Sequence, residues 1–129
     1  MKILLLTSHL NFGGISIYTF SLAKGLKDKG NDVLVGSSGG DLVPQLLNIG
    51  IRHIKIPVNT KSEIGPKAML SVFKLRKILK EEKVELIHAQ TRVTQVVASN
   101  LSRFFKIPYV TTCHGFFKPH GGRLIFPCW

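Results

Sequence analysis

Three short segments of this sequence carry residue types and spacings that suit binding of a polar or phosphorylated ligand. The first is Asn11-Phe12-Gly13-Gly14, which follows an aliphatic run and precedes a helical pattern. Paired glycines at such a turn let the backbone approach a ligand, and the helix that follows offers free N–H groups to a phosphate. The turn matches neither the dinucleotide fingerprint nor a Walker loop. A phosphate site and a tight turn that needs positive φ both remain open.

The second segment is the run HAQTR at residues 88–92. We expect His88 to lie inside a strand, where a core histidine with satisfied hydrogen bonds is more common than a ligand-binding one. Gln90, Thr91 and Arg92 should follow the strand end and present polar groups to a crevice. The alternative for these residues is helix capping, with Thr91 as the N-cap. Arg92 would oppose the helix dipole there, which favours an anionic or hydroxyl-rich ligand beside it.

The third segment is Thr111-Thr112-Cys113-His114-Gly115. His114 follows another predicted strand and could exchange a hydrogen bond with a ligand hydroxyl. Cys113 and His114 are adjacent, and adjacent residues of a strand point to opposite sides, so they do not form a nucleophile–base pair. No Cys/His set has the spacing of metal ligands, and we predict no metal site.

The elements that must position these segments alternate between strands and helices. We predict strands at 2–8, 32–36, 51–56, 85–89 and 108–112, and helices at 14–29, 67–83 and 92–105. A further short helix should be capped by Asp41 and run through Asn48. Two helices carry apolar stripes that we expect to face the core, namely Ile15, Tyr18, Leu22 and Leu26, and Val93, Val96, Val97, Leu101 and Phe104.

This alternation predicts an α/β fold with a doubly wound, Rossmann-like parallel sheet. The usual strand order, 3-2-1-4-5, puts the switch point between the first and fourth strands, and ligands bind there at the carboxyl ends. The three segments should therefore meet at one edge. A nicotinamide oxidoreductase is disfavoured, because Gly36-Ser37 stands where such an enzyme needs an acidic residue.

The net charge of +11 is concentrated in residues 52–83, which hold nine Lys/Arg and three Asp/Glu. In the helix predicted at 67–83, one stripe should pack on the sheet: Ala68, Val72, Leu75 and Leu79. The neighbouring stripe mixes apolar and basic residues: Met69, Phe73, Arg76, Lys80 and Lys83. That stripe is typical of a helix on an anionic membrane surface. The alternative is a solvated helix whose apolar residues are partly covered by a neighbour.

The composition is that of one globular domain. The chain has 129 residues, of which 44% are hydrophobic and 19% charged. No apolar run approaches the about 20 residues of a membrane-spanning helix, and the run at 3–6 is too short for a secretory signal. Two cysteines, Cys113 and Cys128, fit free thiols in a reducing compartment. We expect a cytoplasmic protein that can bind peripherally to the inner face of the membrane.

Together the three segments resemble the N-terminal domain of the family 4 glycosyltransferases, which have the two-domain GT-B fold. Residues 1–33 are similar to that family's first βαβ unit, ELIHAQTRVTQVVA resembles its "D-[IV]-[IV]-H-x-H" segment, and IPYVTTCHGFF resembles its "P-x-[IV]-x-[ST]-x-H-G" segment. The resemblance implies that Gly13 and Gly14 approach the diphosphate of a nucleotide sugar and that His114 contacts the transferred sugar. It also implies that this domain holds the acceptor, for which Asn11, Gln90, Thr91 and Arg92 are the candidates.

The resemblance implies metal-independent transfer with retention, no cofactor, and a glycan or lipid-linked acceptor in cell-surface synthesis. Nothing in the 129 residues matches the family's second, donor-binding domain. We therefore expect residues 1–129 to be one acceptor-binding domain, incomplete at its C-terminus and inactive alone. The rival interpretation is a stand-alone α/β module that binds anionic lipid or nucleic acid through its basic face, although no specific nucleic acid is expected.

Overall fold

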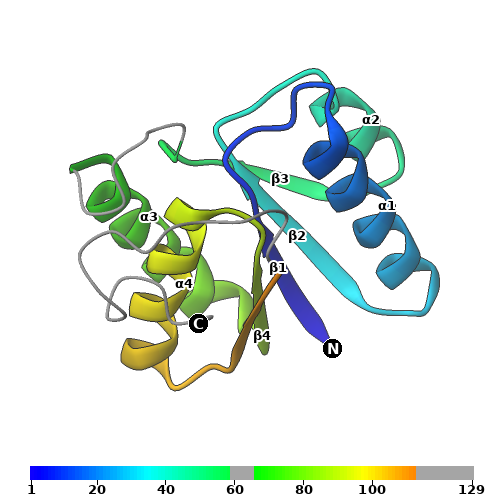
Figure 1. Cartoon of the computed structure of the whole chain (residues 1–129). Coiled ribbons are helices and arrows are strands. Elements are labelled where there is room, and N and C mark those ends of the chain that lie inside the picture. The colour runs from blue at the N-terminus through cyan, green and yellow to red at the C-terminus, as the bar shows by residue number, and fades with distance from the viewer. Residues whose placement is uncertain (59–65, 113–129) are drawn as a thin grey trace.

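The computed structural model describes residues 1–58 and 66–112, apart from the side chains at 67 and 68 (Figure 1). Its strands are β1 (Lys2–Leu6), β2 (Asp32–Ser37), β3 (Arg52–Lys55), β4 (Leu86–Ala89) and β5 (Tyr109–Thr111). Its helices are α1 (Gly14–Asp28), α2 (Val43–Asn48), α3 (Pro66–Glu82) and α4 (Arg92–Phe105).

The five strands form one parallel sheet in the order β3-β2-β1-β4-β5, which confirms the predicted topology. Strand β1 is central, and its Leu4 pairs with Leu34 of β2 and with Ile87 of β4. A central parallel strand is covered on both faces, so its buried side chains must be apolar. The four residues that follow Lys2 in the run KILLL meet this requirement. The switch point between β1 and β4 is where the sequence predicts it.

Helices cover both faces of the sheet, with α3 and α4 on one side and α1 and α2 on the other (Figure 1). Side chains of successive residues in β1 point alternately to the two faces of the sheet. Leu4 and Leu6 belong to the core cluster that includes Leu75 and Leu101. Leu5 belongs to the other cluster, beneath α1 and α2. The central strand therefore anchors both cores.

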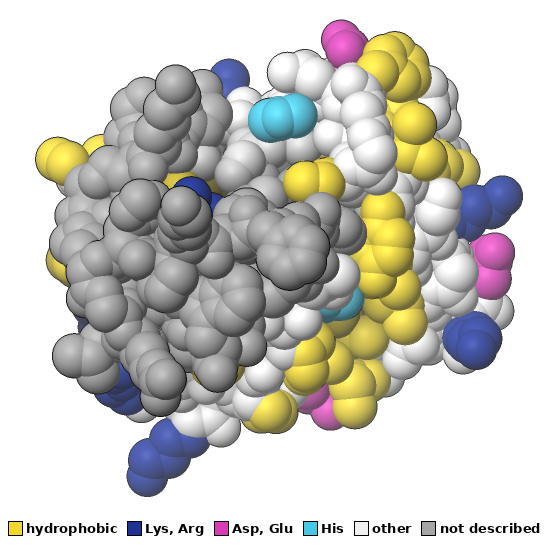
Figure 2. Space-filling view, viewed as in Figure 1, with side chains coloured by type: hydrophobic (Ala, Val, Ile, Leu, Met, Phe, Trp, Pro, Cys, Tyr) yellow, Lys and Arg dark blue, Asp and Glu magenta, His cyan; other side chains and the backbone are white. Residues whose placement is uncertain are grey.

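The buried face of α1 differs from the predicted stripe. The structure buries Ser16, Thr19 and Ala23, whereas Tyr18 is 41% exposed and Leu22 is half-buried. Small residues lie against the sheet, and Thr19 stays satisfied because its hydroxyl donates to a carbonyl oxygen within the helix at 2.8 Å. The larger side chains flank this contact, and Figure 2 shows hydrophobic side chains on the surface beside α1.

Helix α4 shows the same shift. Phe104, predicted to face the core, is 62% exposed, whereas Phe105 packs against the core. Val93, Val97 and Leu101 of the predicted stripe are buried as expected, and the small residues Thr94 and Ala98 are buried beside them because they allow a close approach to the sheet. In α3 the prediction is confirmed for the buried residues Leu75 and Leu79 and for the half-buried Val72, while the side chain of Ala68 lies outside the described residues.

Two predicted boundaries change at the edge that carries the candidate site. Strand β1 ends at Leu6, so Thr7 and Ser8 belong to the turn that follows it. Helix α2 begins at Val43, and its N-cap is Leu42 and not the predicted Asp41. The Asp41 carboxylate instead accepts the backbone N–H of Phe12, at 3.4 Å, and so contacts the glycine-containing turn.

Candidate functional site

A pocket of about 160 Å³ lies where the carboxyl end of β1 meets the N-terminus of α1. Its lining includes Thr7, Ser8, His9, Gly13, Gly14 and Thr91. Residues 7–9, 13–16 and 91 thus come together from distant parts of the chain, as the predicted sheet order requires. Of the third segment, Thr111 and Thr112 are described, whereas Cys113, His114 and Gly115 lie outside the described residues.

The two glycines do not serve a strained turn. Gly13 has φ 167° and ψ 169°, an extended conformation open to any residue, and Gly14 is the first residue of α1. A Cβ atom built on Gly14 would meet nothing within 4 Å, and one on Gly13 would come no closer than 3.9 Å to the Asn11 oxygen. The tight-turn alternative is therefore wrong. Because Gly13 and Gly14 have no side chains, open space remains beside them, and no packing contact among the described residues fills that space.

That open space lies at a helix N-terminus whose donors are available. The first N–H groups of a helix have no carbonyl partner within it, and the helix dipole is positive at this end. In α1 the first turn carries no acidic residue, and Gly13 offers no capping side chain. A helix N-terminus of this kind favours an anionic group such as a phosphate, and the phosphate site at Gly13 and Gly14 stays a prediction.

A chain of hydrogen bonds holds the rim of this pocket. The Ser8 hydroxyl donates to Thr91 Oγ1 at 2.9 Å, and Thr91 Oγ1 lies 2.8 Å from Thr94 Oγ1. The Thr91 N–H donates to the same Thr94 oxygen at 3.0 Å. Thr91 is the N-cap of α4, in an extended conformation, so its predicted capping role is confirmed. Because it also lines the pocket, its ligand-binding role stays a prediction beside the structural one.

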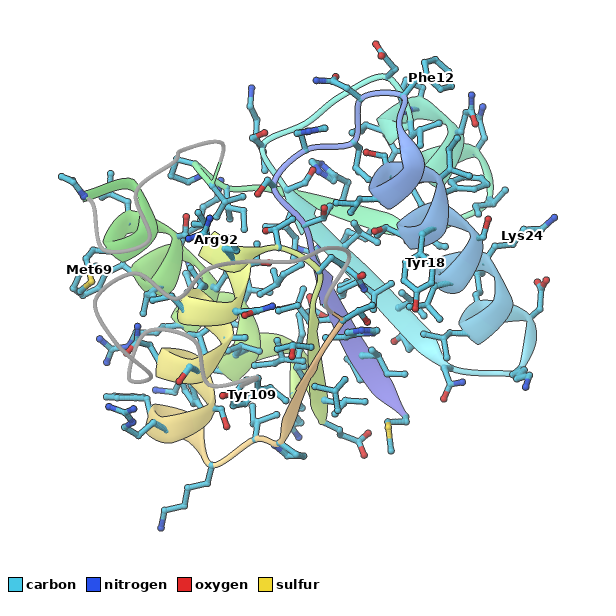
Figure 3. The ribbon with its side chains drawn as sticks, in the orientation of Figure 1. Phe12, Tyr18, Lys24, Met69, Arg92 and Tyr109 are labelled. Carbon is cyan, nitrogen blue, oxygen red and sulfur yellow. The ribbon has the colours of Figure 1, made fainter. Side chains whose placement is uncertain are left out.

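The other three acceptor candidates do not line this pocket. Gln90 is only 2% exposed, and its backbone N–H donates to the Leu6 carbonyl at 2.8 Å. Arg92 is half-buried at the start of α4, on the side of α3 (Figure 3). Asn11 is exposed, and its backbone N–H donates to His9 Nδ1 at 3.3 Å. Their contact with an acceptor stays a prediction.

His88 fits the structural interpretation given to it. It lies within β4, half-buried, with its Nε2 atom 2.7 Å from Thr112 Oγ1. That contact joins β4 to the residue that follows β5. The histidine therefore stabilises the sheet edge and does not line the pocket.

Sequence reasoning placed residues 8–14 at this edge but gave Thr7, Ser8 and His9 no ligand-binding role, because the predicted first strand ran through Ser8. The signal was present, since three polar residues directly follow four aliphatic ones. Polar residues past the end of a buried parallel strand are the usual place for ligand contacts. Among residues 1–58 and 66–112, no group of three His, Cys, Asp or Glu residues could hold a metal ion.

A second feature is an exposed apolar and basic surface on α3 and α4. Met69, Phe73 and Phe104 are 48%, 60% and 62% exposed. The Arg76 guanidinium lies 4.1 Å from the ring centre of Phe104 and 5.7 Å from that of Phe73. With Arg103 these residues line a groove of about 360 Å³. Lys80 and Lys83 are exposed farther along the same predicted stripe.

Similarity to known proteins assigns the domain to a family. The model of glycosyltransferase family 4 matches residues 12–127. The chain belongs to that family. A curated relative, an uncharacterised glycosyltransferase of Methanocaldococcus jannaschii, is 31% identical over 106 residues, which cover 79% of this chain and 27% of the relative. The described helices contain no segment long and apolar enough to cross a membrane.

Two solved structures share the fold. A glycosyltransferase from Rickettsia africae superposes with a TM-score of 0.75 at 24% identity, over 93% of this chain and 31% of that one. HepE from Anabaena, crystallised with UDP and glucose, superposes with a TM-score of 0.66 at 23% identity, over 99% of this chain and 34% of that one. The likeness confirms the predicted Rossmann-like fold. The chain spans about a third of each of these proteins.

Proposed function

We propose that this domain is the acceptor-binding part of a retaining nucleotide-sugar glycosyltransferase of the hexosyltransferase type. The observation that carries the proposal is the pocket at the N-terminus of α1, where Gly13 and Gly14 leave free space beside Ser8 and Thr91. Family membership supplies the reaction class, and the pocket supplies a place for the diphosphate of the donor. HepE, which shares the fold, was crystallised with UDP and glucose, so a uridine nucleotide sugar is the first donor to test.

In this proposal the protein acts by electrostatic stabilisation. As the bond from the sugar to the diphosphate breaks, negative charge grows on the leaving group, and oriented N–H donors at a helix N-terminus stabilise it. The backbone of Gly14 and the following residues provides those donors. His114 would contact the transferred sugar and orient it, as the family resemblance implies. The reaction so described uses no cofactor and no metal.

The acceptor is proposed to be a glycan or a lipid-linked glycan of the cell surface, glycosylated on the cytoplasmic side of the membrane. The exposed surface on α3 and α4 supports the lipid-linked case, because it presents large apolar side chains among cations. Such a surface suits an anionic membrane, whose head groups attract the cations while the apolar side chains enter the interface. We therefore propose that Met69, Phe73, Arg76, Lys80 and Lys83 contact an anionic membrane, together with Phe104.

The decisive experiment is a transfer assay of the complete gene product with UDP-, TDP- and GDP-linked hexoses and extracted glycolipids as acceptors. We expect transfer from one of these donors, resistance to a metal chelator, and a product whose anomeric configuration, measured by NMR, matches that of the donor. Hydrolysis or transfer with inverted configuration would contradict the retaining mechanism. Residues 1–129 purified alone should give no transfer, and measurable turnover by them would contradict the assignment of this domain to the acceptor side.

A further inference from the structure

A second pocket, of about 460 Å³, lies at the same edge of the sheet, beyond the carboxyl ends of β2 and β3. It is lined by Ser38, Lys55, Ile56, Pro57 and Lys74. Ser38 follows β2, Lys55 ends β3, and Lys74 reaches across from α3. None of its described lining residues belongs to the glycine turn or to the run at 88–92.

Two lysines, Lys55 and Lys74, line it. The Lys74 ammonium donates a hydrogen bond to the backbone oxygen of Lys55, which holds the Lys74 charge over the end of β3. The same two positive charges act on His53. Burial first, and then the charges of Lys55 and Lys74, hold the pKa of His53 below its ordinary value. Its Nε2 lies 2.6 Å from the Ser37 hydroxyl. Basic groups from β3 and α3 thus surround one small region.

Within residues 1–58 and 66–112, the carboxylates that form ion pairs lie at the opposite edge of the sheet. The ion pairs within the described residues join Lys2 to Asp32, Lys2 to Glu82, and Arg52 to Glu82. Lys2, Asp32 and Arg52 open β1, β2 and β3, so these pairs lie at the amino ends of the strands. Among residues 1–58 and 66–112, no ion pair involves Lys55 or Lys74. Like charges held together repel, and a bound anion would relieve that repulsion.

The second pocket adjoins the first through one hydrogen-bonded pair. The Ser38 hydroxyl donates to the Ser8 carbonyl oxygen at 2.6 Å, and Ser8 lines the pocket beside Gly13 and Gly14. A ligand against Ser38 therefore lies next to a ligand at the glycines. This is the arrangement that an acceptor needs relative to a donor.

We propose that the pocket between Lys55 and Lys74 binds a phosphate group carried by the glycosyl acceptor. The inference rests on the proposed function and adds the chemical class of the acceptor: a phosphorylated sugar or a phosphate-bearing lipid head group. The two ammonium groups balance the phosphate charge, and the Ser38 hydroxyl adds a neutral hydrogen-bonding contact. A neutral glycan of the same size would leave the two ammonium groups without an anion.

The test compares two double variants with equal charge change. Lys55→Gln with Lys74→Gln removes both ammonium groups, while Lys24→Gln with Lys77→Gln removes two exposed ones outside the pocket. Binding of inorganic phosphate, glucose 6-phosphate and glucose is measured by calorimetry, with melting temperatures as the folding check. We expect the two phosphates and not glucose to bind. Losing two charge-assisted contacts should weaken phosphate binding about tenfold or more, with the control variant near wild type.

A vesicle arm separates the two sources of phosphate. Binding to phosphatidylinositol vesicles that falls in the Lys55/Lys74 variant and not in the control assigns the site to a lipid head group, whereas an effect on glucose 6-phosphate alone assigns it to a phosphorylated sugar. Equal losses in both double variants, or phosphate binding unchanged by Lys55→Gln with Lys74→Gln, would overturn the inference. Sugar transfer to a neutral acceptor without phosphate binding would overturn it and leave the proposed function standing. Lysine-dependent phosphate binding without any sugar transfer would contradict the proposed function and leave the phosphate site standing.

Discussion

Ser38 donates both its backbone N–H, at 3.0 Å, and its hydroxyl, at 2.6 Å, to the carbonyl oxygen of Ser8. This double contact joins the turn after β2 to the turn after β1. The Ser8 hydroxyl in turn donates to Thr91, which caps α4 after β4. These contacts hold together three strand ends that are far apart in the sequence. The bonded pair of Ser8 and Ser38 lies between the two pockets at this edge.

The glycine pocket predicts separable effects of two alanine substitutions in α1. Gly14→Ala should leave the fold intact, since its Cβ meets nothing within 4 Å, but it should place a methyl group in the pocket. Overpacking of this kind costs about 1–3 kcal/mol, so we expect the affinity for the nucleotide sugar to fall about tenfold or more. Isothermal calorimetry on the complete gene product measures it.

Gly25→Ala is the matched control for that experiment. Gly25 lies on the same helix and is exposed, and a Cβ atom added to it would also meet nothing within 4 Å. Alanine there should stabilise the fold by about 0.5–1 kcal/mol because glycine is costly inside a helix, and binding should not change. If both variants bind donor as the wild type does, the pocket does not hold the donor.

His114→Ala, tested in the complete gene product, should lower turnover by about 10²–10³ with little change in melting temperature. The reason is that a hydrogen bond which orients the sugar forms mainly in the transition state. A histidine that only caps its own loop would instead lose about 1 kcal/mol of stability with turnover nearly unchanged. Wild-type turnover with a lowered melting temperature would remove His114 from the site.

The surface on α3 and α4 predicts a lipid-dependent effect. Phe73→Ser with Lys80→Gln should weaken binding to phosphatidylserine vesicles more than to phosphatidylcholine vesicles, since each lysine near an anionic surface contributes about 1 kcal/mol. Vesicle co-sedimentation measures both. The control is Leu47→Ser with Lys24→Gln, because Leu47 is 56% exposed on α2 and Lys24 lies on α1, across the molecule from Met69 (Figure 3). Equal losses of vesicle binding in both variants would contradict membrane binding by the surface on α3 and α4.

His53 predicts a pH dependence of stability. Burial and the nearby lysines lower its pKa below the ordinary value of 6.5. Below about pH 6.5 the unfolded chain therefore takes up the proton more readily than the folded one, so the free energy of unfolding falls as the pH is lowered. His53→Gln should reduce the drop in melting temperature between about pH 7.5 and 5.5. Lys55→Gln with Lys74→Gln should reduce it in part, and identical drops in all three proteins would contradict the assigned cause.

The central strand predicts where the fold is most sensitive. Leu5 is fully buried, and truncation to alanine should lower the free energy of unfolding by about 2–5 kcal/mol through lost burial and a residual cavity. Leu47→Ala at an exposed position should change it by less than about 0.5 kcal/mol. Urea unfolding followed by circular dichroism measures both. Similar values for the two variants would contradict the described core.

The sequence by itself determined the architecture, because the signals involved are local. Aliphatic runs such as KILLL mark buried parallel strands, and their alternation with helices leaves few possible topologies. It also determined the N-cap at Thr91, since capping depends on a polar side chain within one turn of the helix start. The same local patterns located the glycine turn and the exposed basic stripe on α3.

Tertiary structure decided which helix faces are buried and which residues share a pocket. Hydrophobicity favoured Tyr18 and Phe104, but Ser16, Thr19, Ala23, Thr94 and Ala98 lie against the sheet. Small side chains allow a helix to approach a sheet closely, and no periodic pattern of hydrophobicity reveals that preference. The pocket between Lys55 and Lys74 depends on the carboxyl ends of β2 and β3 lying beside the middle of α3. Only the packed sheet creates that proximity, because it brings together residues that are remote in the chain.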